Sequence, residues 1–169
     1  MSALIALLNL TDSFTFVRGL CIMGIAICIY AIKVEAVVLG EKKRNGKPSY
    51  SQLCDVNESV SCTLVLTSKY SHMAKLIFKL HDESFFNLSN AQYGLMFYIA
   101  LLIFHIYPFT LFPFHSWFVL LGAIGSVVAS CGLAYILKYI LHNLCLICLC
   151  MYVVNVLLLI SSIMRFVNA

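Results

Sequence analysis

The sequence predicts an all-α integral membrane protein: a four-transmembrane-helix bundle with one large polar loop between the first and second helices. The chain has 169 residues, of which 62% are apolar and only 11% are charged, and its mean hydropathy is +0.97. Soluble domains are about 45–50% apolar and about 25% charged. This composition excludes a soluble globular enzyme, and it also excludes a disordered chain. The length allows about four spans of about 20 residues and one loop, which we expect to form a single domain over residues 1–169.

Two long stretches lack Asp, Glu, Lys and Arg: residues 84–137, which are 54 residues, and residues 139–164, which are 26 residues. A helix of 54 residues would be about 81 Å long, whereas the hydrocarbon core of a bilayer is about 30 Å thick. The chain must therefore turn back within the first stretch. Pro108 and Pro113 supply the break, because proline removes a backbone donor and clashes with the preceding turn. The sequence thus predicts helices near 92–111 and 115–137.

The two remaining spans are expected near 16–39 and 144–164. The length and charged end of the first span favour a retained helix over a cleaved signal peptide. Lys33 and Glu35 lie near that end, where we expect both side chains to snorkel to the headgroups.

The loop over residues 40–90 contains most of the charge of the chain. Its basic run at 41–47 predicts a cytosolic loop by the positive-inside rule, and we interpret this run as a solvated or lipid-facing strip with no role in binding nucleic acid. Glycosylation sequons at Asn57 and Asn87 indicate the lumen instead, but a third sequon at Asn9 lies on the other side of the first helix. These signals leave the orientation open.

Eight cysteines narrow the chemistry. Cys54 and Cys62 lie in the loop, and Cys145 and Cys148 form a Cys-x-x-Cys motif at the start of the last helix. Asn143 is placed to cap that helix. Both sulfurs would then lie in its first turn, where N–H groups and the helix dipole favour a thiolate. The other four cysteines are expected to be buried packing residues: Cys21, Cys28, Cys131 and Cys150.

Three interpretations of the Cys-x-x-Cys pair remain open. A redox-active dithiol is the one we favour. A structural zinc site shared with Cys54 and Cys62 is the second, although the seven-residue gap between those two cysteines is unlike the usual short spacing of zinc ligands. An inert structural disulfide is the third. The favoured interpretation requires no metal and no tightly bound cofactor.

Polar side chains share one face of the last helix with this pair. At 100° per residue, Cys145, Cys148, Tyr152 and Asn155 fall within an arc of about 80°. Tyr152 could donate a hydrogen bond to a carbonyl oxygen near Cys148, and Asn155 either contacts a ligand or joins helices. An apolar two-electron acceptor that dissolves in lipid and presents carbonyls is most economically a quinone. The loop cysteines could then pass electrons from a soluble partner to the helix pair.

The order of these motifs resembles the vitamin K epoxide reductase family. The matching features are the loop segment Cys54-Asp-Val-Asn-Glu-Ser-Val-Ser-Cys62, then Asn90 with Gly94 and Phe97-Tyr98, and then Cys145-Leu-Ile-Cys148 with Tyr152 and Asn155. Arg18-Gly-Leu-Cys21 and Tyr30-Ala31 also match, so the resemblance covers nearly the whole chain.

The resemblance implies an endoplasmic reticulum membrane enzyme that reduces vitamin K 2,3-epoxide to the quinone and the quinone to the hydroquinone, in support of gamma-carboxylation. It implies a luminal loop in which Cys54 faces a luminal thioredoxin-fold redox protein and Cys62 attacks Cys145. Cys148 matches the catalytic nucleophile.

The same resemblance assigns substrate contacts. Asn90 and Tyr152 match two hydrogen-bond donors to the substrate, at positions that coumarin-type inhibitors also use. Ser68 matches a serine near the site, and Phe97 is expected to line the substrate pocket.

Two competing functions are considered. A quinone-linked disulfide-forming protein would use the same electron flow chiefly to oxidise luminal client thiols, and only a substrate assay distinguishes it. A non-enzymatic four-span scaffold of the tetraspanin or claudin type would have no role for a Cys-x-x-Cys pair on a face with Tyr152, which counts against it.

Overall fold

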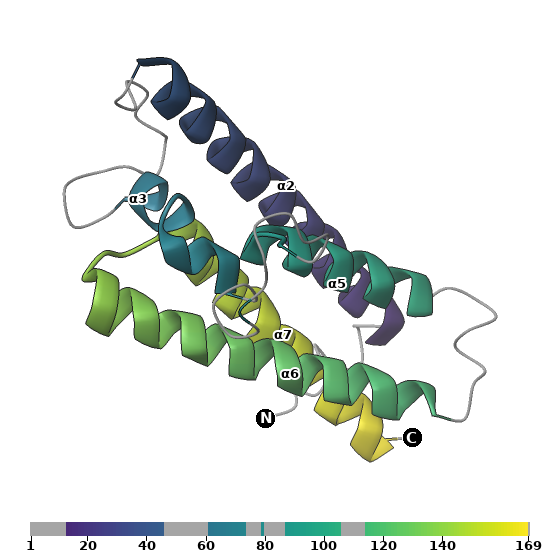
Figure 1. The fold of residues 1–169 in the computed structure, drawn as a ribbon. Coiled ribbons are helices and arrows are strands. Elements are labelled where there is room, and N and C mark those ends of the chain that lie inside the picture. The colour runs from purple at the N-terminus through teal and green to yellow at the C-terminus, as the bar shows by residue number, and fades with distance from the viewer. Residues whose placement is uncertain (1–12, 46–60, 74–78, 80–86, 106–113, 169) are drawn as a thin grey trace.

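The computed structural model describes residues 13–45, 61–73, 79, 87–105 and 114–168, and this part of the chain is helical (Figure 1). The long helices are α2 (Ser13–Asn45), α5 (Asn90–Phe104), α6 (His115–Ile136) and α7 (Leu146–Asn168). Two short elements lie between α2 and α5: α3 (Cys62–Leu66) and the 3-10 helix η1 (Lys69–His72). A π-helical turn, η3 (Leu137–Leu141), continues α6.

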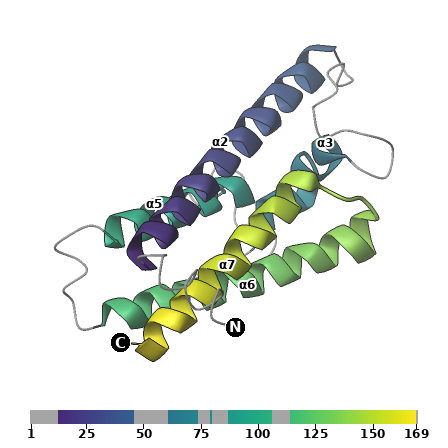
Figure 2. The same ribbon diagram turned by 180° about the vertical axis from the view of Figure 1, so that it is seen from behind.

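The long helices pack side by side. α2 packs against α5 and α7, and α6 packs against α7. Figures 1 and 2, which view the bundle from opposite sides, show α3 beside the N-terminal end of α7 and the C-terminal end of α6. Three segments are long and apolar enough to cross a membrane: Thr15–Glu41, His115–Leu141 and Leu146–Val167. The apolar helix α5 is shorter, with 15 residues.

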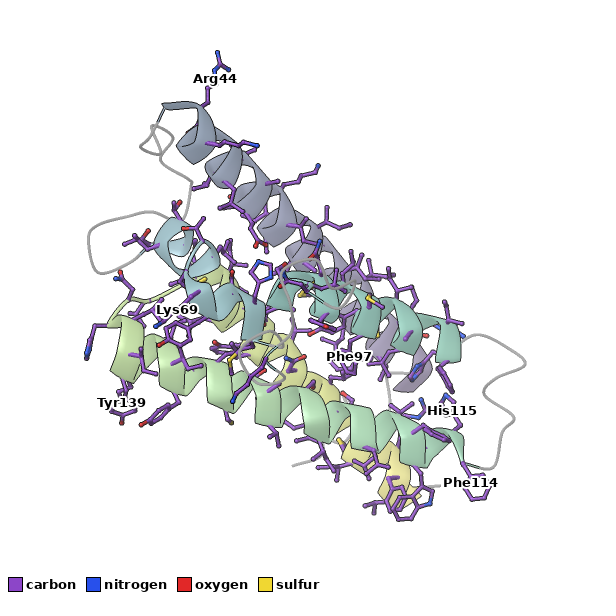
Figure 3. All side chains as sticks on the ribbon, in the orientation of Figure 1. Arg44, Lys69, Phe97, Phe114, His115 and Tyr139 are labelled. Carbon is purple, nitrogen blue, oxygen red and sulfur yellow. The ribbon has the colours of Figure 1, made fainter. Side chains whose placement is uncertain are left out.

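The observed helix bounds differ from the expected ones mainly at their ends. α2 extends to Asn45, so its 33 residues span about 50 Å and exceed the hydrocarbon thickness. Figure 3 shows Arg44 at its far end, at the opposite end of the molecule from His115. α5 ends at Phe104, with His105 as its C-cap, and residues 106–113, including Pro108 and Pro113, lie outside the described residues.

The start of α5 is fixed by a reciprocal cap. The Ser89 hydroxyl accepts a hydrogen bond from the Gln92 backbone N–H, and the Gln92 side chain accepts one from the Ser89 backbone N–H. Such a capping box satisfies two of the backbone donors that a helix start leaves unpaired. It makes Asn90 the first residue of α5, which determines where the Asn90 side chain projects.

The segment between α6 and α7 reverses the chain and pairs with the loop between α2 and α5. His142 adopts a left-handed conformation with φ of 51° after η3. Two residues later, the Leu144 carbonyl accepts a hydrogen bond from the Ser61 backbone N–H at 3.0 Å. Because Cys62 and Cys145 each follow directly, this backbone bond brings the loop cysteine next to the helix cysteine.

α2 and α5 pack tightly at a glycine. A Cβ atom at Gly24 would lie 2.6 Å from the Tyr98 ring. That ring is 1% exposed, and its hydroxyl is bonded to Asn155 on α7, so it has no room to move away.

We therefore expect Gly24→Ala to lower the stability of the bundle by about 1–3 kcal/mol, the usual cost of overpacking a core. Thermal unfolding in detergent measures this effect. Gly19→Ala on the same helix is the control, because a Cβ there meets nothing within 4 Å. Equal melting temperatures for the two variants would contradict the packing.

Candidate active site

Two thiols meet at the start of α7. The sulfur atoms of Cys145 and Cys148 are 2.6 Å apart, longer than the disulfide bond of about 2.05 Å but near enough for the two thiols to be in direct contact. The Cys148 backbone N–H also donates to the Cys145 sulfur at 3.3 Å. Cys145 is fully buried, whereas Cys148 is partly exposed. The pair is thus arranged to interconvert between a dithiol and a disulfide.

The prediction that Asn143 caps α7 is wrong. The Asn143 amide donates instead to the Leu141 carbonyl, and its own backbone N–H bonds back to Leu137 in η3. The first turn of α7 is closed by Cys145, whose carbonyl accepts from the Leu149 N–H and whose sulfur accepts from the Cys148 N–H. The chain is still extended at Leu144, so the helix begins later than the asparagine would require.

The pKa of Cys145 is raised above that of an ordinary thiol, the opposite direction to the expectation that the helix start favours its thiolate. The hydrogen bond with Cys148 raises the pKa of Cys145, the bond with Cys62 opposes that shift, and burial raises the pKa further. A neutral Cys145 keeps a proton beside Cys148, so it can supply that proton as the pair reacts.

Cys145 contacts a second cysteine, Cys62, as well as Cys148. Cys62 is the first residue of α3, it is fully buried, and its side chain hydrogen-bonds to Cys145. The prediction that Cys62 meets Cys145 is consistent with this contact. Cys54 lies outside the described residues, so its pairing with Cys62 stays a prediction. The alternative of a zinc site shared with Cys54 is untested for the same reason.

A cavity of about 720 Å³ opens beside the Cys148 sulfur. Its walls come from α2, the segment from α3 through Met73, α5, α6, η3 and α7, and no charged side chain lines it among the described residues. Ligand pockets of about 300–1,000 Å³ with apolar walls and a few polar groups are typical of small-molecule sites. This cavity therefore suits a neutral, largely apolar molecule.

The side chains predicted to contact substrate all line this cavity: Ser68, Asn90, Phe97 and Tyr152, together with Cys148. The Tyr152 hydroxyl is buried and makes no hydrogen bond to the described residues. A buried phenol without a partner is costly, and this hydroxyl is available to donate to a ligand in the cavity.

Asn90 makes two structural hydrogen bonds that the sequence did not reveal. Its amide donates to the Tyr70 carbonyl at 2.8 Å and accepts from the Met73 N–H at 3.1 Å. Asn90 therefore fixes the η1 segment against α5, and its NH₂ group carries a second N–H that can face a ligand.

Ser68 and Phe97 are placed by local contacts. The Ser68 hydroxyl donates to the Val65 carbonyl at 2.8 Å, so it can offer a ligand only its acceptor lone pairs. Phe97 projects from α5 toward α6 (Figure 3), where a Cβ at Gly122 would lie 3.3 Å from its ring. The glycine leaves the room that this ring occupies.

Asn155 joins three helices, in agreement with one of its two proposed roles. It accepts a hydrogen bond from the Tyr98 hydroxyl and donates to the Ser130 hydroxyl at 2.8 Å, which donates in turn to the Ser126 carbonyl. These four residues also line the cavity. Their network was missed, although polar residues on otherwise apolar helices are a signal for it.

The burial predicted for other individual residues is correct for some and wrong for others. Cys21 and Cys28 are buried as predicted, but the same prediction is wrong for Cys131 and Cys150, which are exposed on helix faces that no other described element covers. Glu35 does not snorkel: it is 7% exposed and pairs with His72 in η1 at 3.5 Å. His72, 37 residues further along the chain in the loop, is its partner, which spacing along α2 alone does not reveal.

The fold and the site define a class: a helical membrane protein whose dithiol opens on an apolar cavity, the arrangement of a membrane thiol oxidoreductase. The chain belongs to the vitamin K epoxide reductase family, which it matches over residues 15–163. It is 32% identical to vitamin K epoxide reductase complex subunit 1 of Rattus norvegicus over 145 residues, which are 85% of this chain and 84% of the relative. The Mus musculus protein of the same name is 31% identical over the same extent.

Proposed function

We propose that this membrane oxidoreductase reduces vitamin K 2,3-epoxide to the quinone and the quinone to the hydroquinone, with Cys145 and Cys148 as the immediate reductant. The observation that carries the proposal is the position of Cys148, which lies 2.6 Å from a second thiol and lines an apolar cavity. Family membership and the named relatives support the substrate class.

The chemistry balances with the two thiols alone. The Cys148 thiolate forms a C–S bond to the quinoid ring, or opens the epoxide by breaking one C–O bond. Cys145 then attacks the Cys148 sulfur, the C–S bond breaks, and its electron pair stays with the substrate. The quinone takes up two protons to become the hydroquinone, and the epoxide adduct loses its hydroxyl as water. In both cases one Cys145–Cys148 disulfide is left.

The loop cysteines then reduce the Cys145–Cys148 disulfide again. Cys62, which is hydrogen-bonded to Cys145, attacks the helix disulfide at the Cys145 sulfur. A mixed Cys62–Cys145 disulfide is the intermediate. We propose that Cys54 then closes a loop disulfide with Cys62, and that a luminal thioredoxin-fold protein reduces it. This scheme needs no tightly bound cofactor.

The same proposal sets the membrane arrangement. The apolar helix α5, which has 15 residues, would be the fourth span beside the three longer ones, with the redox loop in the lumen of the endoplasmic reticulum. α3 and the start of α7 then share the luminal end of the bundle, where a soluble reductant has access to the loop. Coumarin-type inhibitors would compete with the substrate at Asn90 and Tyr152.

Tyr152→Phe tests the proposed hydrogen bond to substrate. We expect kcat for quinone reduction to fall about 10–100-fold, because a preorganised donor to a developing oxyanion is lost, while folding is unchanged since the hydroxyl has no partner among the described residues. Tyr135→Phe, on an exposed part of α6, is the control. A Tyr152→Phe enzyme with the parent kcat would remove the phenol from the mechanism.

The direct test of the function is reduction of the epoxide and the quinone by membranes containing the protein, driven by a small membrane-permeant dithiol. We expect turnover of at least one of the two substrates. Oxidation of a reduced client protein with quinone as the acceptor, and no epoxide turnover, would favour the disulfide-forming function instead. Activity toward neither would reject the proposal.

A further inference from the structure

The short segment Lys69–Met73 forms one wall of the cavity. It comprises η1 and the residue after it, and its Tyr70 and Met73 side chains line the cavity. Figure 3 shows Lys69 on this segment, in front of the α3 end of the bundle. Asn90 attaches the segment to the start of α5 through the two hydrogen bonds described above.

A second attachment joins the same segment to α2. Glu35 lies on α2 within a candidate membrane span, and its carboxylate is 3.5 Å from Nε2 of His72. The Glu35 side chain is 9% exposed and the His72 side chain 33%. An ionisable group inside a membrane span is costly and calls for a partner and a role, and the thiol chemistry uses neither residue.

The neighbours of Glu35 on α2 are buried. Val34 and Val38 on either side of it belong to a buried cluster that also contains Cys62, Val65 and Cys145. Glu35 is therefore presented from a buried face of α2 that shares a cluster with Cys62 and Cys145, whereas His72 belongs to a four-residue helix that packs against α3 and α5.

We propose that Glu35 and His72 are positioning residues that latch the Lys69–Met73 segment over the cavity and so control the affinity for the substrate and the access of solutes to Cys148. The substrate part of this inference rests on the proposed function; the access part does not. The latch makes no contact with the reacting atoms. It acts through Tyr70 and Met73, which it holds against the cavity.

The kinetic test breaks the pair with Glu35→Gln and, separately, with His72→Gln. If the latched fraction falls to about a tenth, the apparent KM rises about tenfold while kcat of the bound complex stays nearly the same. Glu35→Asp keeps the carboxyl group but withdraws it from His72, so its KM should lie between the parent and Glu35→Gln. Lys33→Gln, an exposed change two residues away on α2, should leave both constants unchanged.

A swapped pair tests the interaction itself. Glu35→His combined with His72→Glu exchanges the two side chains, so that a carboxyl group again faces an imidazole. We expect the KM of this double variant to return to within about threefold of the parent. Such a recovery distinguishes a coupled pair from two independent losses. A purely structural role would lower the amount of folded protein in all variants without raising KM.

An activity-independent measurement covers the case in which the protein reduces neither substrate. After reduction by a dithiol, N-ethylmaleimide labelling of Cys148 is followed by mass spectrometry, with the exposed Cys131 as the internal reference. Breaking the latch should increase the Cys148 rate several-fold relative to Cys131, and the swapped pair should reverse this. Unchanged KM and labelling in both single variants, or variants that only fail to fold, would overturn the inference.

Discussion

Replacing Cys148 with alanine is expected to abolish the reduction of both vitamin K epoxide and the quinone, by a factor on the order of a thousand or more. Cys148 is the member of the dithiol that lines the cavity, and no thiolate adduct forms without it. Cys28 also lines the cavity, but it belongs to a different buried cluster from Cys145, so we do not expect it to replace Cys148. Dithiol-driven turnover in membranes measures the effect.

Cys150→Ala is the matched control for this experiment. Cys150 lies two residues further along α7 and is exposed, and its helix position points nearly opposite to Cys148. We expect the parent activity for this variant. An active Cys148→Ala protein would contradict the mechanism, whichever reductant is used.

Replacing Cys62 with serine is expected to separate two sources of electrons. With a thioredoxin-fold protein as reductant, turnover should fall about 100-fold or more, because exchange with Cys145 requires the sulfur that now contacts it. With a small membrane-permeant dithiol, much of the activity should remain, since Cys145 and Cys148 are unchanged. Cys54→Ala should behave in the same way.

Cys131→Ser, on the exposed face of α6, controls for the loss of a thiol as such and should be active with both reductants. A variant of Cys62 that loses activity equally with both reductants would argue against a shuttle and for a structural role of α3. Full activity of Cys62→Ser with the protein reductant would place the entry of electrons elsewhere.

Much of the fold could be predicted because lipid imposes strong constraints. The charge-free stretches located α6 and α7 to within a few residues, since an unpaired charge in hydrocarbon is costly and long apolar runs have few other uses. The far end of α2 was harder to place. The helix continues past the apolar residues into Glu41 and Arg44, where no membrane signal marks an end.

The candidate site was predictable where spacing along one helix is enough. Cys148 and Tyr152 are four residues apart on α7, so they had to share a face, and both line the cavity. Contacts between distant segments were not predictable in this way. The backbone hydrogen bond between Ser61 and Leu144 brings Cys62 to Cys145. No sequence pattern in either segment predicts that hydrogen bond.

The two mistaken assignments at polar residues have a common cause. Asn143 is a good capping residue and Glu35 a plausible snorkelling one when each is considered on its own helix. In the structure, the turn after η3 delays the start of α7, and the loop supplies His72 to Glu35. Tertiary contacts decided both outcomes.

The central claim is that the Cys145–Cys148 dithiol is itself the electron donor to the substrate. A single-turnover experiment tests it most directly: the fully reduced protein is mixed with one equivalent of vitamin K quinone, and product and disulfides are quantified together by mass spectrometry. We predict one Cys145–Cys148 disulfide for each hydroquinone formed, before any disulfide that includes Cys62. Hydroquinone formed while Cys145 and Cys148 both stay reduced would contradict the account.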